Sequence, residues 1–177
     1  MLVLTMKKKL VLQGLMGLTI SCGLLLINSE IAHSSFYSYY CNRYNGIPTT
    51  FVLTNRGALP IIRWVSVNLP SATPEQRCQT VSRNFQIAYE KGNLKFITTG
   101  EMNNQPVVCT TAHINGSCQD LLFTLRPGSN PKAILRRLLD RRGLAAGNPL
   151  NQTGEEFYLD FEDYLNRLSS RYTSTGN

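Results

Sequence analysis

Short apolar runs in the middle of the chain predict β-strands. The clearest run is Pro60–Val67, which is rich in β-branched residues and opens on a proline, as the start of a strand allows. Similar runs bounded by turn residues predict further strands at 39–41, 51–54, 94–101, 105–112, 118–125 and 157–159. The three strands between 94 and 125 form a predicted meander. Its register stays open because apolar and polar residues alternate only in part.

One segment has a complete set of helix signals. Thr73 is the predicted N-cap, Pro74 takes the first helical position, and Gln76 completes a capping box. Gly92 then ends a helix predicted over residues 73–91. Apolar residues recur along it at helical spacing and form one stripe, made of Cys78, Val81, Phe85, Ala88 and Tyr89.

Two further helices are predicted nearer the C-terminus. Asn130-Pro131 repeats the cap-then-proline pattern and opens a helix over residues 131–142. Asp160 caps a short last helix. Their apolar faces consist of Ile134, Leu135, Leu138 and Leu139 in the first, and of Phe161, Tyr164, Leu165 and Leu168 in the second.

These elements predict a single α+β domain over residues 35–168. An antiparallel sheet of about five strands packs against the two main helices, with the short C-terminal helix beside them. Trp64, the only tryptophan, is expected to anchor the core because its ring buries a large area. Residues 169–177 are polar and predict a flexible tail.

Residues 1–34 have the pattern of an export signal. Three lysines at 7–9 precede an apolar run over 10–27, and Ala32-His33-Ser34 supplies small residues for a signal-peptidase cut. The run is also just long enough to be a retained membrane anchor, and Ser21-Cys22 offers a weaker lipoprotein site. All three readings export the domain to the periplasm or envelope, where it is soluble or membrane-associated.

Charge narrows the choice of partners. Removal of residues 1–34 leaves 143 residues with 15 basic and 10 acidic side chains, a net charge of +5. This mild excess favours anionic lipid or cell-wall polymer as partners. Nucleic acid is not expected, since its binding motifs are absent and the domain is exported. No protein partner can be named.

Four cysteines remain after the export signal, and an even number in an oxidising compartment predicts two disulfides. Three pairings are open in principle, and we favour Cys41–Cys78 with Cys109–Cys118. The second pair brackets an Asn-Gly turn, so its sulfurs lie across a hairpin if the flanking strands pair. The first pair ties the mature N-terminus to the first helix.

Four arginines of the second predicted helix are the candidate anion-binding residues. Arg136, Arg137, Arg141 and Arg142 can bind phosphate or carboxylate, because a guanidinium group presents paired donors. The alternative is an ordinary solvated helix face, with Asp140 interleaved among the cations.

Acidic residues gather over 155–163 and comprise Glu155, Glu156, Asp160, Glu162 and Asp163. They lack the alternating loop of an EF-hand, so no calcium site is predicted. Asp160 and Asp163 are better explained as cap and first-turn residues of the last helix. A pair from this cluster would serve an envelope glycan hydrolase, which we keep as an alternative function.

No catalytic, metal or cofactor motif occurs in the sequence. Cysteine and histidine spacings typical of zinc or redox sites are absent, and so are nucleophile-elbow, phosphate-loop and dinucleotide motifs. A nucleophile would have to use His113, the only histidine after residue 34. We therefore predict no metal, no cofactor and a non-catalytic protein.

Six separated motifs cover most of residues 37–168. They are Tyr40-Cys41, Gly57-x-x-Pro60-x-Ile62-Arg63-Trp64, Pro74-x-x-Arg77-Cys78-x-x-Val81-Ser82-x-x-Phe85, Leu94-x-x-Ile97-Thr98-Thr99-Gly100, Asn104-x-Pro106-Val107-Val108-Cys109 and Cys118-x-x-Leu121-Leu122-Phe123-Thr124-Leu125-x-Pro127-Gly128. Together they resemble the cyanobacterial circadian oscillating polypeptide (COP23) family. The resemblance implies an exported or membrane-associated cyanobacterial protein, supplies no catalytic residues, and includes the four cysteines.

The leading functional hypothesis is a non-catalytic binding or structural module of the cyanobacterial envelope. Beside the glycan hydrolase, a second alternative is a protease inhibitor that presents the loop over residues 109–118. Small exported domains held by disulfides can display such a rigid loop.

Overall fold

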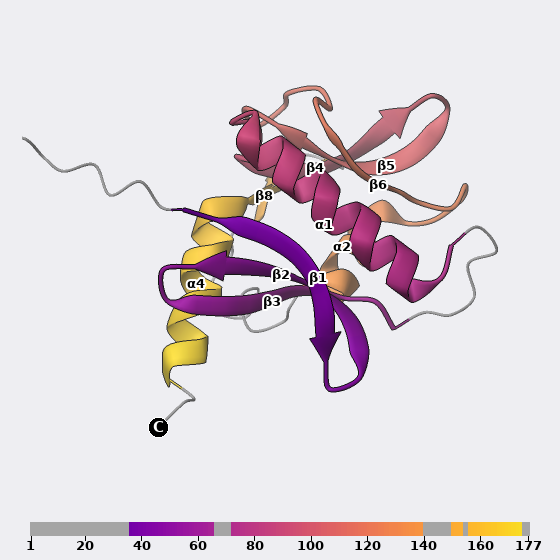
Figure 1. The fold of residues 1–177 in the computed structure, drawn as a ribbon. Helices are drawn as coiled ribbons and strands as arrows, with labels where there is room; N and C mark the ends of the chain where they lie inside the picture. Colours follow the sequence, from indigo (N-terminus) through magenta and orange to yellow (C-terminus); the bar gives the residue numbers. More distant parts are fainter. Residues whose placement is uncertain (1–35, 66–71, 140–149, 154–155, 175–177) are drawn as a thin grey trace, which may run out of the picture. The chain divides into compact units, whose positions relative to one another are not determined.

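The structure is a computed structural model, and it describes most of the chain after residue 35 (Figure 1). The described residues are 36–65, 72–139, 150–153 and 156–174. The chain divides into two units, Met1–His33 and Ser34–Asn177. The first unit, and with it the predicted export signal, lies outside the described residues. Within the described ranges, the second unit has the predicted α+β class. Its strands, however, form two antiparallel sheets instead of one.

The first sheet is an antiparallel meander of β1 (Ser38–Tyr44), β2 (Ile47–Thr54) and β3 (Gly57–Arg63). The turn between β1 and β2 consists of Asn45 and Gly46, whose φ angles are 50° and 77°. Both angles lie in the region that a two-residue hairpin turn requires and that Asn and Gly adopt most easily.

The pairing of β2 with β3 shifts at Pro60. Thr50 pairs with Ile62 whereas Phe51 pairs with Pro60, so Ile61 is an extra residue in β3. Proline has no N–H to donate to the ladder, and a bulge is one of the few places where a sheet accepts it. Ile61 and Ile62 are both buried, so the bulge supplies two successive side chains to the core.

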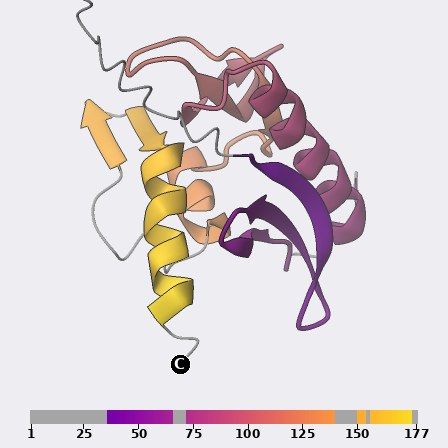
Figure 2. The same cartoon turned by 60° about the vertical axis from the view of Figure 1, so that its left-hand side comes forward.

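The second sheet has five strands in the order β6-β5-β4-β8-β7. Their bounds are Phe96–Met102 (β4), Gln105–Thr111 (β5), Leu121–Thr124 (β6), Leu150–Thr153 (β7) and Glu156–Asp160 (β8). The predicted meander is confirmed as β4-β5-β6, with a hairpin turn at Asn103 and Asn104. The sequence did not predict β7, which pairs with β8 at the edge of the sheet near α4 (Figure 2).

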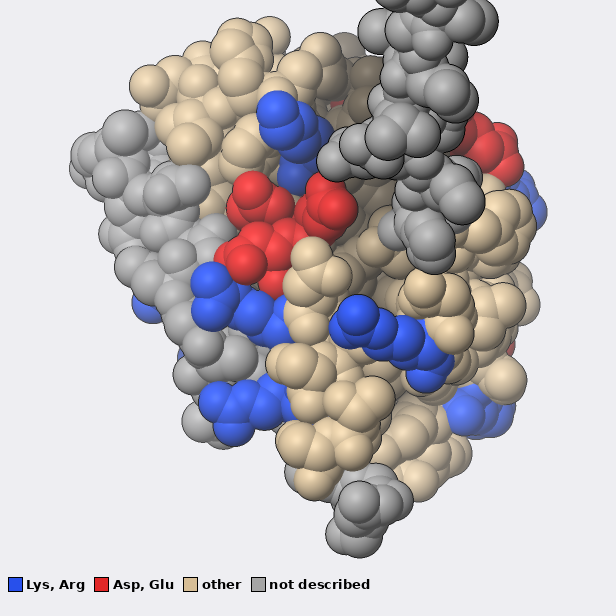
Figure 3. Space-filling view, turned by 90° about the vertical axis from the view of Figure 1, so that its left-hand side faces the viewer, with Lys and Arg blue, Asp and Glu red and all other residues tan. Residues whose placement is uncertain are grey.

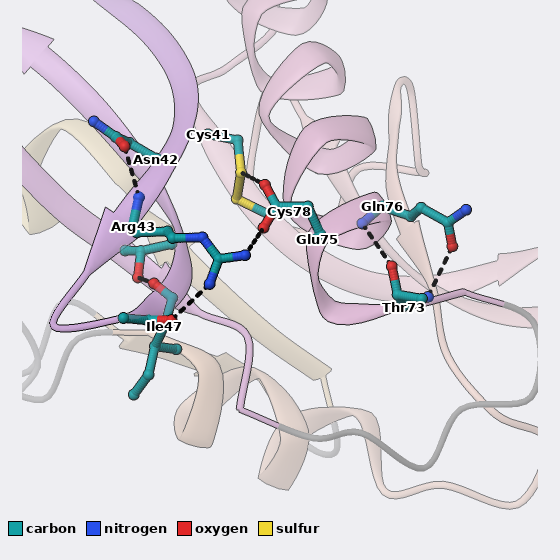
Figure 4. Close-up of polar contacts among 10 residues, drawn as sticks. Cys41, Asn42, Arg43, Ile47, Thr73, Glu75, Gln76 and Cys78 are labelled. Carbon is teal, nitrogen blue, oxygen red and sulfur yellow. Dashed lines mark hydrogen bonds and ion pairs between the residues drawn. A yellow bond between two sulfur atoms is a disulfide. The ribbon is translucent and has the colours of Figure 1, made fainter.

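Helix α1 (Pro74–Glu90) has the predicted capping box at its start. The Gln76 backbone N–H donates to Thr73 Oγ1 at 3.2 Å, and the Thr73 N–H donates to Gln76 Oε1 at 2.9 Å (Figure 4). The helix packs against β1 and β2 of the first sheet and β6 of the second (Figure 1). Four members of the predicted stripe are buried there, namely Cys78, Val81, Phe85 and Ala88.

Helix α2 (Pro131–Leu138) is shorter than predicted. Asn130 caps it through a 2.9 Å hydrogen bond from the Ala133 N–H. The next residue, Leu139, is extended, its side chain is buried, and its backbone bridges Ile62 of β3. This tertiary contact ends the helix where local spacing alone would continue it.

Helix α4 (Phe161–Ser174) is longer than predicted and replaces most of the expected tail. Ser169 is buried and Tyr172 packs against the core, so the last turns have an inner face that the polar composition concealed. Phe161, Tyr164, Leu165 and Leu168 are buried as the stripe indicated.

One hydrophobic core joins the two sheets and the helices. Trp64 is buried, as expected, and its Nε1 donates to Thr50 Oγ1 at 3.1 Å. The Ser82 hydroxyl of α1 donates to the same oxygen, also at 3.1 Å, so the polar groups in this part of the core are satisfied. Among the described residues, no helix is long and apolar enough to cross a bilayer.

Candidate functional site

A cavity of about 700 Å³ opens between α1, β6 and α2. We call it the α1–α2 cavity. Its lining comes from four segments of chain: the two residues after β3, Ala72 with one side of α1, the stretch from β6 to residue 129, and one side of α2. The volume lies within the range of about 300–1,000 Å³ that small-molecule sites occupy.

The inner wall of the α1–α2 cavity is apolar and aromatic. Trp64 and Phe123 meet edge to face, with ring centroids 5.7 Å apart. Leu122 and Leu125, also in the lining, are buried. Core packing holds these side chains in place, so the wall is a fixed surface.

Three arginines from distant parts of the sequence line the same cavity: Arg77 of α1, Arg126 after β6, and Arg137 of α2. The Arg77 Cζ lies 5.4 Å from the centroid of the Trp64 ring, a cation–π arrangement. Burial lowers the pKa of Arg77 below its usual value, and the positive charge of Arg126 lowers it further. The site therefore holds like charges close together beside an apolar wall.

The other polar groups of the α1–α2 cavity are neutral. Gln76, Thr80 and Asn84 lie along one side of α1, and the Asn84 amide donates to the Leu122 carbonyl at 2.9 Å. No Asp or Glu is among the described residues that line the cavity. A bound anion would meet cations and neutral donors without repulsion from a carboxylate.

The structure divides the four arginines predicted as the anion-binding group. Arg136 and Arg137 are both exposed, and of the two only Arg137 lines the α1–α2 cavity. Arg141 and Arg142 lie outside the described residues. Within the described part of the chain, Arg137 is thus the member of the predicted group that lines the cavity, together with Arg77 of α1 and Arg126 of the loop after β6.

Sequence reasoning missed Arg77 and Arg126. A signal for Arg77 was available, because Arg77, Thr80 and Asn84 recur at helical spacing beside the buried stripe of α1. Such a mixed polar and apolar stripe lies at the border between core and solvent. Arg126 follows β6 in a loop and carries no comparable pattern.

Three members of the acidic cluster, Asp160, Glu162 and Asp163, lie at the start of α4, whereas Glu156 begins β8 and Glu155 lies outside the described residues. The Asp163 N–H donates to Asp160 Oδ1 at 3.0 Å, and Asp163 pairs with Arg167 at 2.7 Å. Glu162 lies at a smaller cavity of about 230 Å³, in which it is the only described acidic residue. Figure 3 views the side of the molecule that carries α4 and shows a small acidic group with basic side chains around it. The hydrolase alternative, which needs two carboxylates on either side of a scissile bond, stays a prediction.

Both disulfides have the pairing that the sequence favoured. Cys41–Cys78 joins β1 to α1, with a Cα–Cα distance of 5.5 Å (Figure 4). Beside it, Glu75 of α1 pairs with Arg43 of β1 at 3.1 Å, so the two elements are tied by a covalent bond and an exposed ion pair. Disulfides of this kind are typical of an oxidising environment.

Cys109–Cys118 closes the loop between β5 and β6. Within the loop, the Gly116 N–H and the Thr111 hydroxyl both donate to the His113 carbonyl, at 3.0 and 3.1 Å. The loop is thus held by its own hydrogen bonds, and the His113 side chain is exposed. Its role in a protease inhibitor stays a prediction.

The fold and the cavity define a small disulfide-bonded α+β domain with a partly apolar cavity lined by three arginines. A family model described as circadian oscillating protein COP23 matches residues 38–166, which is most of the chain. The chain therefore belongs to the COP23 family. Neither a curated protein nor a solved structure matches it.

Proposed function

We propose that the protein is an exported, non-catalytic binding module of the cyanobacterial cell envelope, which binds an anionic ligand at the α1–α2 cavity. The observation that carries the proposal is the meeting of Arg77, Arg126 and Arg137 at a cavity whose described lining has no carboxylate. Guanidinium groups bind carboxylate and phosphate oxygens through paired donors. An anion would also relieve the repulsion that Arg126 exerts on Arg77.

Two observations support the exported location. The domain contains two disulfides, which form and persist outside the reducing cytosol. The first 34 residues also follow the order of an export signal, with lysines before an apolar run and small residues after it. A location in the periplasm or the envelope, with or without membrane association, agrees with both observations.

The test is stabilisation of the intact, oxidised protein by a panel of anions: phosphate, sulfate, octanoate, peptidoglycan fragments and phosphatidylglycerol vesicles. A ligand that binds the folded state raises the midpoint of thermal unfolding. We expect at least one member to do so, and Arg126→Glu and Arg137→Glu to weaken its binding about tenfold or more.

Matched controls are available on α1 and α2. Arg136→Glu and Arg83→Glu reverse exposed charges on α2 and α1 that do not line the cavity. They change the net charge as much as the test variants do, and we expect them to leave binding unchanged. If no anion stabilises the protein, or if all four variants weaken binding equally, the cavity is not an anion site.

A further inference from the structure

We propose that the ligand of the α1–α2 cavity is a free, single-chain amphiphile with one acidic head group and an aliphatic tail. This inference rests on the proposed function, because it takes anion binding at the same cavity as given. It adds the chemistry of the rest of the ligand and its physical state, a monomer taken from solution.

The size and composition of the cavity favour a tail. An inorganic anion would fill only a small part of about 700 Å³. The rest of the space borders the Trp64 and Phe123 rings and neighbouring leucines, which offer apolar surface and few hydrogen bonds. Burial of an aliphatic chain there is favourable in proportion to the apolar area removed from water.

The position of Arg77 connects the head-group site to the apolar wall. Its guanidinium lies over the Trp64 ring, so an acidic group bound to it brings the attached atoms toward that ring. A glycan polymer would need many hydrogen-bonding partners along its length. One of the two N–H donors of the Asn84 amide on this side is already bound to the Leu122 carbonyl.

Two large apolar side chains of the lining reach solvent. Leu121 is 39% exposed and Val65 is 63% exposed. An aliphatic chain that covers these side chains would remove further apolar area from water. They extend the apolar wall outward, which suits a flexible tail better than a compact anion.

The experiment uses the fluorescence of Trp64, which is the only tryptophan of the chain and lines the cavity. The intact, oxidised protein is titrated with octanoate, decanoate and dodecanoate below their micelle concentrations. We expect affinity to rise about fourfold for each added methylene until the cavity is filled. Dodecyltrimethylammonium, with the same tail and a cationic head, is expected not to bind at the site.

Variants separate head-group from tail recognition. Arg126→Glu is expected to weaken dodecanoate binding about tenfold or more, while Arg83→Glu leaves it unchanged. Leu121→Gln is expected to weaken dodecanoate several-fold and octanoate less. Its control is Ile87→Gln, since Ile87 on α1 is 40% exposed, nearly as much as Leu121, but lies outside the cavity lining.

Each outcome decides between the two proposals. If phosphate or octanoate binds in an Arg126-dependent way but affinity does not rise with chain length, the amphiphile inference fails and the anion site stands. The inference also fails if the protein binds vesicles through Arg126 and dodecanoate does not compete with them. The ligand would then be part of a membrane surface and not a free monomer. Failure of every anion in the panel removes both proposals.

Discussion

At the scale of single residues, Gly100 of β4 lies directly against the Cys109–Cys118 disulfide. A Cβ added there would lie 2.6 Å from Cys118 Sγ and 3.9 Å from Cys109 Sγ. The sulfur cannot rotate away, because it is bonded to its partner across the β5–β6 loop. We therefore expect Gly100→Ala to lower the free energy of unfolding by about 1–3 kcal/mol, as other overpacked sites do. Denaturant unfolding of the oxidised protein measures this cost.

The control for Gly100→Ala removes the sulfur that causes the clash. In a Cys109→Ala/Cys118→Ala background the same glycine substitution should cost much less, so the two changes should be strongly non-additive. Equal costs in the two backgrounds would mean that the disulfide is not what requires glycine at this position.

Asp120 makes stability depend on pH. Hydrogen bonds from Lys91 and then Asn93, each 2.6 Å long, lower the pKa of its carboxyl. A depressed folded-state pKa gives stability that is present above the unfolded pKa of about 3.9 and is lost as pH falls further. Because Lys91 is more than half exposed, we expect the contribution to be about 1 kcal/mol or less.

Urea unfolding from pH 7 to pH 2 tests this prediction. Asp120→Asn should be less stable than the wild type at pH 7 and should approach it as pH falls through the folded-state pKa. Glu101→Gln, on an exposed position of β4, is the matched control and should show little effect at any pH. A constant difference between wild type and Asp120→Asn across the range would exclude an ionisation effect.

Single residues were predictable where their role depends on their own chemistry or their near neighbours. Thr73 and Asn130 cap helices as the sequence indicated, and Trp64 is buried because its ring has too much apolar area to leave in water. Gly100 and Asp120 were not singled out. Their roles come from partners brought close by strand pairing and loop closure, which local patterns do not specify.

At the scale of elements, the two disulfides join different kinds of neighbours and should contribute unequally. Cys41–Cys78 spans 37 residues and links β1 to α1, whereas Cys109–Cys118 spans 9 residues within one hairpin. The chain-entropy model gives about 4 kcal/mol for the longer loop and about 2.7 kcal/mol for the shorter. We expect Cys41→Ala/Cys78→Ala to be the more destabilising pair in denaturant unfolding, by about 1 kcal/mol. A larger loss of unfolding free energy for Cys109→Ala/Cys118→Ala would contradict the chain-entropy model.

Element boundaries were predictable where the ending signal is local. Gly92, with a φ of 73°, follows α1 as expected, and the Asn103-Asn104 turn joins β4 to β5. The C-terminal ends of α2 and α4 were not predictable. A bridge from Leu139 to Ile62 ends α2, and packing of Tyr172 on the core accompanies the continuation of α4 to Ser174. Both depend on residues far away in the sequence.

At the scale of the whole molecule, one core supports both sheets and shapes the α1–α2 cavity. Helix α1 contacts both sheets, and its inner stripe carries Cys78 and Phe85 into that core. The side of α1 next to the stripe faces β6 and α2 across the cavity. Because the rigid packing of the core fixes these elements, the cavity is a property of the tertiary arrangement and belongs to no single element.

The sequence by itself determined the α+β class, the meander of β4 to β6, the caps and start of each main helix, and the disulfide pairing that we favoured. Side-chain periodicity and turn chemistry act over a few residues, and four cysteines allow only three disulfide pairings. Only the tertiary structure decided the division into two sheets and the meeting of Arg77, Arg126 and Arg137. Those outcomes depend on which apolar faces pack against one another. This packing brings together residues up to 60 positions apart in the sequence, and no local pattern relates such residues.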